Sequence, residues 1–223
     1  MNKYLISVFI VTLFSVSIAD AQVIMGVGPG YIHRFHRPQQ RNRFQQQNLP
    51  KFEPSVNLSI GYGFPNQDKY ELADFYNYYK GNITQSGPVT GILDYQFSRN
   101  MSIGVMVTHG KVSVPYYDYN NPYTSVLKGS LDNWAFMLNI VRYMPVNNSK
   151  VSPYIRTAIG INTWTQDYTD ASGSKINLGG TQPTDLAYQV GLGAKFKLSK
   201  NAGFFAEAGY GKYILHGGVF FKF

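Results

Sequence analysis

Two histidines follow residue 54, and imidazole is the side chain best suited to proton transfer near neutral pH. Hydrolysis would require a serine, or a group of carboxylates, beside one of them. His109 precedes Gly110 and Lys111, with Ser113 four residues on, so no H-x-S pair stands on one face of a strand. The neighbours of His216 are apolar or glycine. We expect both histidines to be ordinary rim residues, and we predict no catalytic residue, metal site or cofactor.

Several charged residues lie on the polar faces of segments that otherwise alternate between apolar and small side chains: Asp94, Arg156, Lys195, Lys197 and Glu207. Where the other face of a strand meets an apolar environment, such residues must point inward and find partners there. One register of the last strands places Leu198 opposite Phe204. That register also places Lys195 opposite Glu207, and a slip by one permitted step places Lys197 there instead. The sequence therefore predicts a Lys–Glu contact, in either a proton or ion path or a plug that fills the interior.

Alternation at period two runs almost without a break from residue 55 to the end, which is typical of β-strands with one apolar face. We predict an all-β fold, an eight-stranded antiparallel up-and-down transmembrane β-barrel over residues 55–223, because an even strand count is normal for single-chain bacterial barrels. A soluble barrel would point its apolar face inward, and here the opposite face is too polar and glycine-rich for a soluble exterior. The lumen of eight strands is filled by side chains, which favours the plug. The segments are 55–64, 89–98, 101–108, 133–140, 154–162, 186–198 and the hairpin 202–223.

The first 54 residues differ from the rest. Residues 1–21 have the form of a secretory signal peptide, with Lys3, an apolar run at 5–18 and an A-x-A cleavage pattern. Residues 22–54 form a basic, glutamine-rich arm that has little to bury, so we expect a flexible periplasmic arm. The arm could be a solvated linker or could dock on an acidic partner, and a secreted chain is not expected to meet nucleic acid. Its arginines are Arg34, Arg37, Arg41 and Arg43.

The connections between segments fall into two classes. Those at 99–100, 146–150 and 200–201 are short, and those at 65–88, 116–129 and 167–183 are long. Bacterial membrane barrels have short periplasmic turns and long external loops, so both termini are expected in the periplasm. Residues 68–79 have the spacing of a short amphipathic helix. Loop tyrosines either give a large contact area at low entropic cost or anchor the loops at the membrane interface. The candidate contact residues are Tyr70, Tyr76, Tyr79, Tyr117, Tyr119 and Tyr123.

The final hairpin contains FAEAGYG and ends on FKF, with an aromatic residue last. This ending resembles the insertion signal of Gram-negative outer-membrane β-barrels, and the strand pattern resembles that of the small OmpA/OmpX-type barrels throughout residues 55–223. The resemblance implies a bacterial outer-membrane location, contact with outer membrane lipids and insertion by the barrel assembly machinery. Phe221 and Phe223 are the expected assembly signal. The resemblance names no activity.

Three functions fit these features. The first is a structural or surface-interaction role through the Tyr-rich external loops, which would meet a surface protein, lipopolysaccharide or a host surface. The second is an accessory subunit of an envelope complex, docked on a periplasmic protein through the basic arm. The third is a rim enzyme acting on lipid, which the missing partners of the histidines disfavour. Open pores for large solutes have many more strands. We therefore expect a non-enzymatic interaction barrel.

Overall fold

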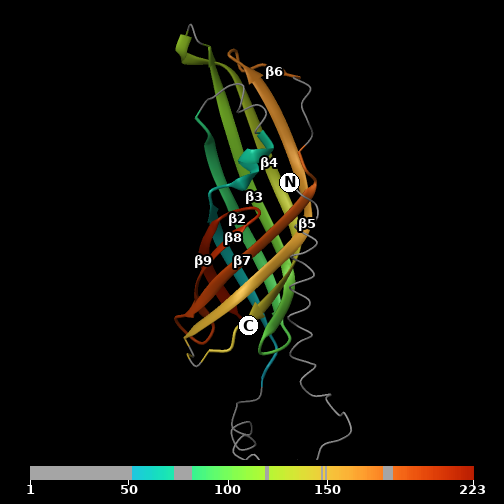
Figure 1. The fold of residues 1–223 in the computed structure, drawn as a ribbon, viewed down its shortest axis with the longest axis vertical. Helices are drawn as coiled ribbons and strands as arrows, with labels where there is room; N and C mark the ends of the chain where they lie inside the picture. Colours follow the sequence, from blue (N-terminus) through green and yellow to red (C-terminus); the bar gives the residue numbers. More distant parts are fainter. Residues whose placement is uncertain (1–51, 73–81, 119–120, 147, 149, 178–182) are drawn as a thin grey trace, which may run out of the picture. The chain divides into compact units, whose positions relative to one another are not determined.

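Eight antiparallel strands close on themselves in a computed structural model (Figure 1). The structure describes residues 52–72, 82–118, 121–146, 148, 150–177 and 183–223, without the side chains of 118 and 121–125. The predicted signal peptide and almost all of the predicted arm, including its arginines, lie outside these residues. No helix in the described ranges is long and apolar enough to span a bilayer. The strands are β1 (Ser55–Phe64), β2 (Thr84–Gln96), β3 (Met101–Asp118), β4 (Asn121–Tyr143), β5 (Val151–Asp170), β6 (Lys175–Ile176), β7 (Leu186–Lys197), β8 (Ala202–Tyr210) and β9 (Leu215–Lys222).

The barrel closes where the first strand meets the last. β1 pairs with β2 on one side and with β9 on the other, and β4 pairs with β5, so the ring runs through every strand except β6. The two-residue strand β6 pairs only with the far end of β5. At the seam, Phe223 exchanges backbone hydrogen bonds with Val56, with N···O distances of 3.1 and 2.8 Å. The prediction of an all-β, eight-stranded antiparallel barrel is confirmed.

The barrel is apolar outside and polar inside, the reverse of a soluble protein. Along β1 the residues Val56, Leu58 and Ile60 are exposed, whereas the alternating Asn57 and Ser59 are buried. Period-two alternation places one set of side chains on each face of a strand. In hydrocarbon every backbone N–H and C=O must be bonded within the protein, and a closed ring of strands satisfies this requirement. The sequence pattern thus produces an exterior suited to lipid.

Three neighbouring strands are much longer than the others. A strand crosses a bilayer in about 9–11 residues, and β1, β8 and β9 contain 10, 9 and 8 residues. In contrast, β3, β4 and β5 contain 18, 23 and 20 residues, and in Figure 1 they continue past the rest of the barrel. We call this extension the projecting sheet, formed by residues 110–118, 121–133 and 163–170.

The projecting sheet corrects two predicted loops. Residues 116–129 and much of 167–183 were expected to be long loops, but β3 and β4 are separated only by residues 119–120, and β5 continues to Asp170. The extra length is stable because it has its own hydrophobic core. The buried members of that core are Leu72, Val112, Val114, Leu127 and Leu131, and the partly buried ones are Ile83, Tyr116, Trp164, Tyr168 and Ile176.

The two ends of the barrel differ. At the end where β1 begins and β9 finishes, here called the terminal end, the connections are short: residues 97–100, 144–150 and 198–201. At the opposite end, here called the loop end, lie the connection after β1, the projecting sheet, the connection after β5 and the tight turn between β8 and β9. Short connections therefore lie at the predicted positions.

Candidate functional site

One arginine in the lumen has several partners. Arg156, on β5, is almost completely buried. Its Nε donates to Glu207 Oε2 at 3.0 Å, its Nη1 donates to Asn139 Oδ1 at 3.1 Å, and its Nη2 lies 3.9 Å from Asp94 Oδ2. Glu207 is also fully engaged, because the hydroxyls of Tyr154 and Tyr213 donate to its two oxygens at 2.9 and 3.0 Å. A buried ion pair is tolerated when hydrogen bonds satisfy its remaining atoms, and Glu207 meets this condition.

The predicted partner of Glu207 is wrong. The structure pairs Gly193 with Glu207 and Phe196 with Phe204, a shift of one permitted step from the predicted register, in the direction that brings neither lysine opposite the acid. The glycine leaves room for the Tyr154 ring, which would collide with any side chain added there. Lys195 instead donates to the Tyr143 hydroxyl at 3.1 Å. The partner of Glu207 is instead Arg156, because β5 places its guanidinium within hydrogen-bond distance of the Glu207 carboxylate.

The remaining predicted lumen residues are less well connected. Asp94 is completely buried, yet neither of its carboxylate oxygens has a hydrogen-bond partner among the described residues. Arg156 Nη2 approaches its Oδ2 atom to 3.9 Å. Lys195 Nζ lies over the rings of Tyr143 and Phe220, at 5.5 and 5.2 Å from their centroids. Lys197 is exposed at the terminal end of β7 and lies outside the network.

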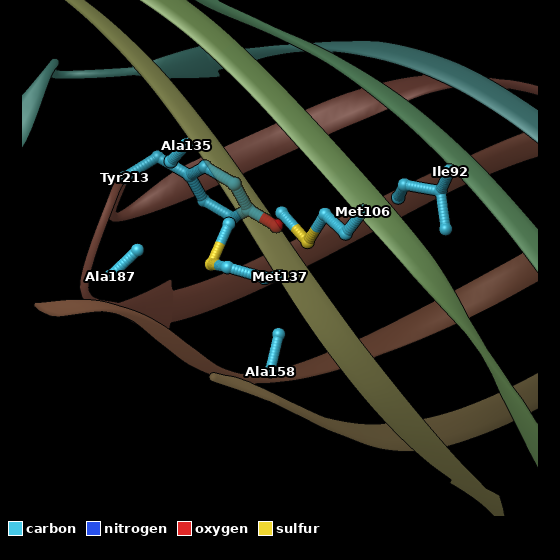
Figure 2. Packing of buried hydrophobic residues seen from close by; sticks show 7 residues of the cluster. All are labelled: Ile92, Met106, Ala135, Met137, Ala158, Ala187 and Tyr213. Carbon is cyan, nitrogen blue, oxygen red and sulfur yellow. The ribbon is translucent and has the colours of Figure 1, made fainter. Parts of the chain in front are cut away.

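Above this network, toward the loop end, lies a belt of apolar side chains. Ile92, Met106 and Met137 are consecutive register partners on β2, β3 and β4. Figure 2 shows the Met106 and Met137 side chains beside the ring of Tyr213, inside the curve of the strands. Small residues, Ala135, Ala158 and Ala187, complete the cluster. We call this cluster the lumen belt, and it interrupts the polar lining of the lumen.

The loop end of the lumen is covered by a short helix, η2 (Gln67–Leu72), in the connection after β1. Its buried Asp68 forms an ion pair with Lys212, from the turn between β8 and β9, and accepts a hydrogen bond from Asn133 at 2.9 Å. Lys212 donates to Asn162 at 2.9 Å, and its Nζ lies 5.1 Å from the Trp164 ring centroid. We call this group the cap.

One glycine turn and one exposed contact between distant segments lie beside the cap. Gly211 has a φ of 139°, a backbone conformation that favours glycine, immediately before Lys212. Glu71 accepts a hydrogen bond from the Thr184 backbone at 2.9 Å, which ties η2 to the segment before β7. The predicted amphipathic helix at 68–79 is corrected, because the described part is a 3₁₀-helix that begins at Gln67 and residues 73–81 lie outside the described ranges.

The predicted contact tyrosines are only partly described. Tyr70 on η2 is 62% exposed, with the Lys69 ammonium 5.1 Å from its ring centroid. Tyr117, near the end of β3, is 40% exposed. The side chains of Tyr76, Tyr79, Tyr119 and Tyr123 lie outside the described set. At the opposite end, Phe221 and Phe223 are exposed on the exterior, where a lipid-facing aromatic residue belongs.

The far end of β5 carries a preformed turn. The Asp170 carboxylate accepts hydrogen bonds from the Ser172 hydroxyl at 2.6 Å and from the Ser172 and Ser174 backbone N–H groups at 2.9 Å. These donors hold the pKa of the Asp170 carboxyl below its ordinary value, with the Ser172 hydroxyl contributing most. A side chain that organises its own turn in this way fixes the tip of the projecting sheet.

The comparisons with known proteins give the family. The profile of the outer membrane protein beta-barrel domain matches residues 42–219. The chain belongs to this family. The predicted resemblance to small OmpA/OmpX-type barrels is thereby confirmed, and the apolar exterior is the lipid-facing surface of an outer-membrane barrel. No curated protein matches this outer-membrane barrel.

Several solved structures show a distant similarity to this chain. A designed transmembrane β-barrel is 15% identical and covers 78% of this chain and 98% of its own, with a TM-score of 0.42. Ail, the attachment invasion locus protein of Yersinia pestis, in complex with the heparin analogue sucrose octasulfate, is 12% identical, with coverages of 76% and 97% and a TM-score of 0.40. The N-terminal barrel domain of Pseudomonas aeruginosa OprF is 15% identical, with coverages of 76% and 97% and a TM-score of 0.38.

The histidines of the outer-membrane barrel occupy two different environments. His109 lies on the exterior, stacked on Trp134 with centroids 4.4 Å apart, and its Nε2 lies 3.1 Å from Asp132 Oδ1. His216 is buried, which corrects its predicted rim position, because the alternation of β9 points it inward between Phe205 and Tyr213. In the described part of the chain, no group of three His, Cys, Asp or Glu side chains could hold a metal ion.

Proposed function

We propose that this outer-membrane barrel is a closed, non-enzymatic scaffold that displays its projecting sheet at the cell surface for interaction with a macromolecular partner. The observation that carries the proposal is the length of β3, β4 and β5 beyond what a bilayer crossing needs, together with the separate core that stabilises the extension. A cell that maintains this much ordered structure outside the membrane gains a rigid surface for binding. Tyr70 and Tyr117 supply exposed aromatic area, also at the loop end of the barrel.

The contents of the lumen support the closed state. The Arg156–Glu207 network fills the lumen toward the terminal end, the lumen belt crosses its middle, and the cap covers the loop end. Eight strands enclose an interior that side chains fill, whereas open pores for solutes have sixteen strands or more. A function carried on the outer surface therefore fits the barrel better than passage through it.

We infer the orientation of the barrel from the lengths of its connections. Short connections belong to the periplasmic side of outer-membrane barrels and long ones to the outside. The terminal end, with its three short connections, would then face the periplasm with both termini. The loop end, with the projecting sheet and the cap, would face outward.

Cysteine labelling on intact cells tests this orientation. The chain has no cysteine, so single substitutions give a clean background. Ala171→Cys lies in the exposed turn after β5 at the loop end, and Lys200→Cys lies in the exposed turn between β7 and β8 at the terminal end. A membrane-impermeant maleimide is expected to label the first variant on intact cells and the second only after the outer membrane is permeabilised. Labelling of Lys200→Cys alone on intact cells would invert the proposed orientation, and labelling of neither would end the surface-display proposal.

A further inference from the structure

The exposed charges of the barrel are distributed unequally between its two ends. At the terminal end, Glu53 is the exposed acid among the described residues, and it stands against a larger set of cations. We call these exposed cations the basic collar: Arg99, Arg142, Lys150, Lys197 and Lys200. At the loop end two of the described lysines form ion pairs, Lys175 with Asp167 and Lys212 with Asp68. Exposed positive charge is therefore concentrated at the terminal end of the barrel.

The basic collar extends around the terminal end from the β2–β3 turn to the β7–β8 turn. Its members come from the β2–β3 turn, the end of β4, the β4–β5 connection, the end of β7 and the β7–β8 turn. Every connection at the terminal end thus contributes at least one cation. A binding site for one protein partner would gather its charges on one face, whereas a ring of charges fits a ligand that surrounds the barrel.

The basic collar also coincides with the edge of the lipid-facing surface. Arg142 is the register partner of Met101, whose side chain is exposed on the exterior. Lys197, at the end of β7, precedes the exposed Leu198. Lysine and arginine at such an edge lay their methylene stems along apolar surface and place the charge at the level of the lipid headgroups.

We propose that the basic collar binds the headgroups of anionic phospholipids in the leaflet that surrounds the terminal end. The recognised group is the phosphodiester together with the net negative charge of the headgroup, for which Lys and Arg are the natural partners. Each cation near an anionic lipid surface strengthens association about fivefold. In the orientation proposed above, this leaflet is the periplasmic one, so the collar would fix the depth of the barrel from that side.

The test measures lipid selectivity with the mature full-length protein in phosphatidylcholine vesicles. Spin-labelled phosphatidylglycerol and spin-labelled phosphatidylcholine report, as the motionally restricted fraction, how strongly each lipid associates with the barrel at 50 mM and at 500 mM NaCl. The variant replaces the three lysines of the collar: Lys150→Gln, Lys197→Gln and Lys200→Gln. The matched control removes the same charge at the loop end: Lys69→Gln, Lys128→Gln and Lys175→Gln. The basic arm is present in every sample, so the comparison isolates the collar.

The native protein is expected to prefer phosphatidylglycerol several-fold at low salt and to lose most of that preference at high salt, because exposed charges are screened. The collar variant is expected to lose at least half of the preference, and the loop-end control is expected to keep it. Heat-shifted gel mobility confirms that each variant is folded. Equal association of the two lipids with the native protein at both salt concentrations would overturn the proposal without reference to any variant. Equal losses in the two triple variants would also overturn it.

Discussion

Replacement of Glu207 by Gln should lower the unfolding temperature of the barrel sharply, whereas replacement of Asp94 by Asn should leave it nearly unchanged. Glu207 is the carboxylate that contacts Arg156 at 3.0 Å and accepts the Tyr154 and Tyr213 hydroxyls. Glutamine keeps the shape but removes the charge, so Arg156 would lose its close counter-ion inside the barrel. Breaking a buried pair from one side costs about 3–5 kcal/mol.

Asp94 is the matched control because it is just as buried and approaches the same arginine. It makes no hydrogen bond to a described residue, and its closest oxygen lies 3.9 Å from Arg156 Nη2. Its neutral analogue gives up a weak attraction and recovers the cost of a buried carboxylate, so the net change should stay below about 1 kcal/mol. Heat-shifted gel mobility against temperature measures both variants. Equal shifts for the two substitutions would show that the network does not depend on Glu207 in the way described.

The second large effect concerns the cap. Replacement of Asp68 by Ala removes the carboxylate that pairs with the buried Lys212 ammonium and leaves its hydrogen bond to Asn162, at a cost of about 3 kcal/mol. We expect η2 to leave the mouth of the barrel and to expose Trp164, which lies beneath Lys212. Acrylamide quenching reports this exposure, in a Trp134→Phe background that leaves Trp164 as the single tryptophan. Quenching should increase several-fold in the Asp68→Ala variant.

Two further variants make the cap prediction specific. Asp68→Ala combined with Lys212→Met removes both charges and keeps an unbranched side chain over Trp164, so it should restore most of the protection. Glu71→Ala, on the same helix, removes one exposed hydrogen bond to the Thr184 backbone and should change quenching little. If acrylamide quenches Trp164 fluorescence to the same extent in the Asp68→Ala variant and in the native protein, the ion pair does not hold η2 in place.

The barrel fold could be predicted because the alternation that specifies it can be read within each strand. Residues such as Val56, Leu58 and Ile60 alternate with Asn57 and Ser59, and period two leaves no other regular structure that separates them. The extension of β3 and β4 was missed although Val112 and Val114 also alternate. The tyrosine, asparagine and proline residues that follow them resemble loop composition, and the stabilising contact with Leu72 comes from a segment about 40 residues away.

The site residues were harder to predict because their contacts cross the barrel. The alternation places Arg156, Lys195 and Glu207 on the inner face, but several registers satisfy the same parity, and the structure has neither of the two that would pair a lysine with Glu207. The cap joins Asp68 to Lys212 across 144 residues, and no fixed spacing marks such a pair. Gly211 before Lys212 was a visible turn signal, but it does not show what the lysine binds.

The measurement that tests the surface role most directly compares the native barrel with one that lacks part of the projecting sheet. Val114 and Gly129 are register partners, so a two-residue Asn-Gly turn can join them in place of residues 115–128. Cells carrying the native barrel, the shortened barrel or no barrel would be compared for attachment to one panel of glycan-coated and protein-coated surfaces, with folding checked by heat-shifted mobility. We predict that the native barrel raises attachment to at least one surface and that the folded, shortened barrel attaches no better than cells without it. Attachment by the shortened barrel at the native level, or no gain from the native barrel on any surface, would contradict a role for the projecting sheet in surface interaction.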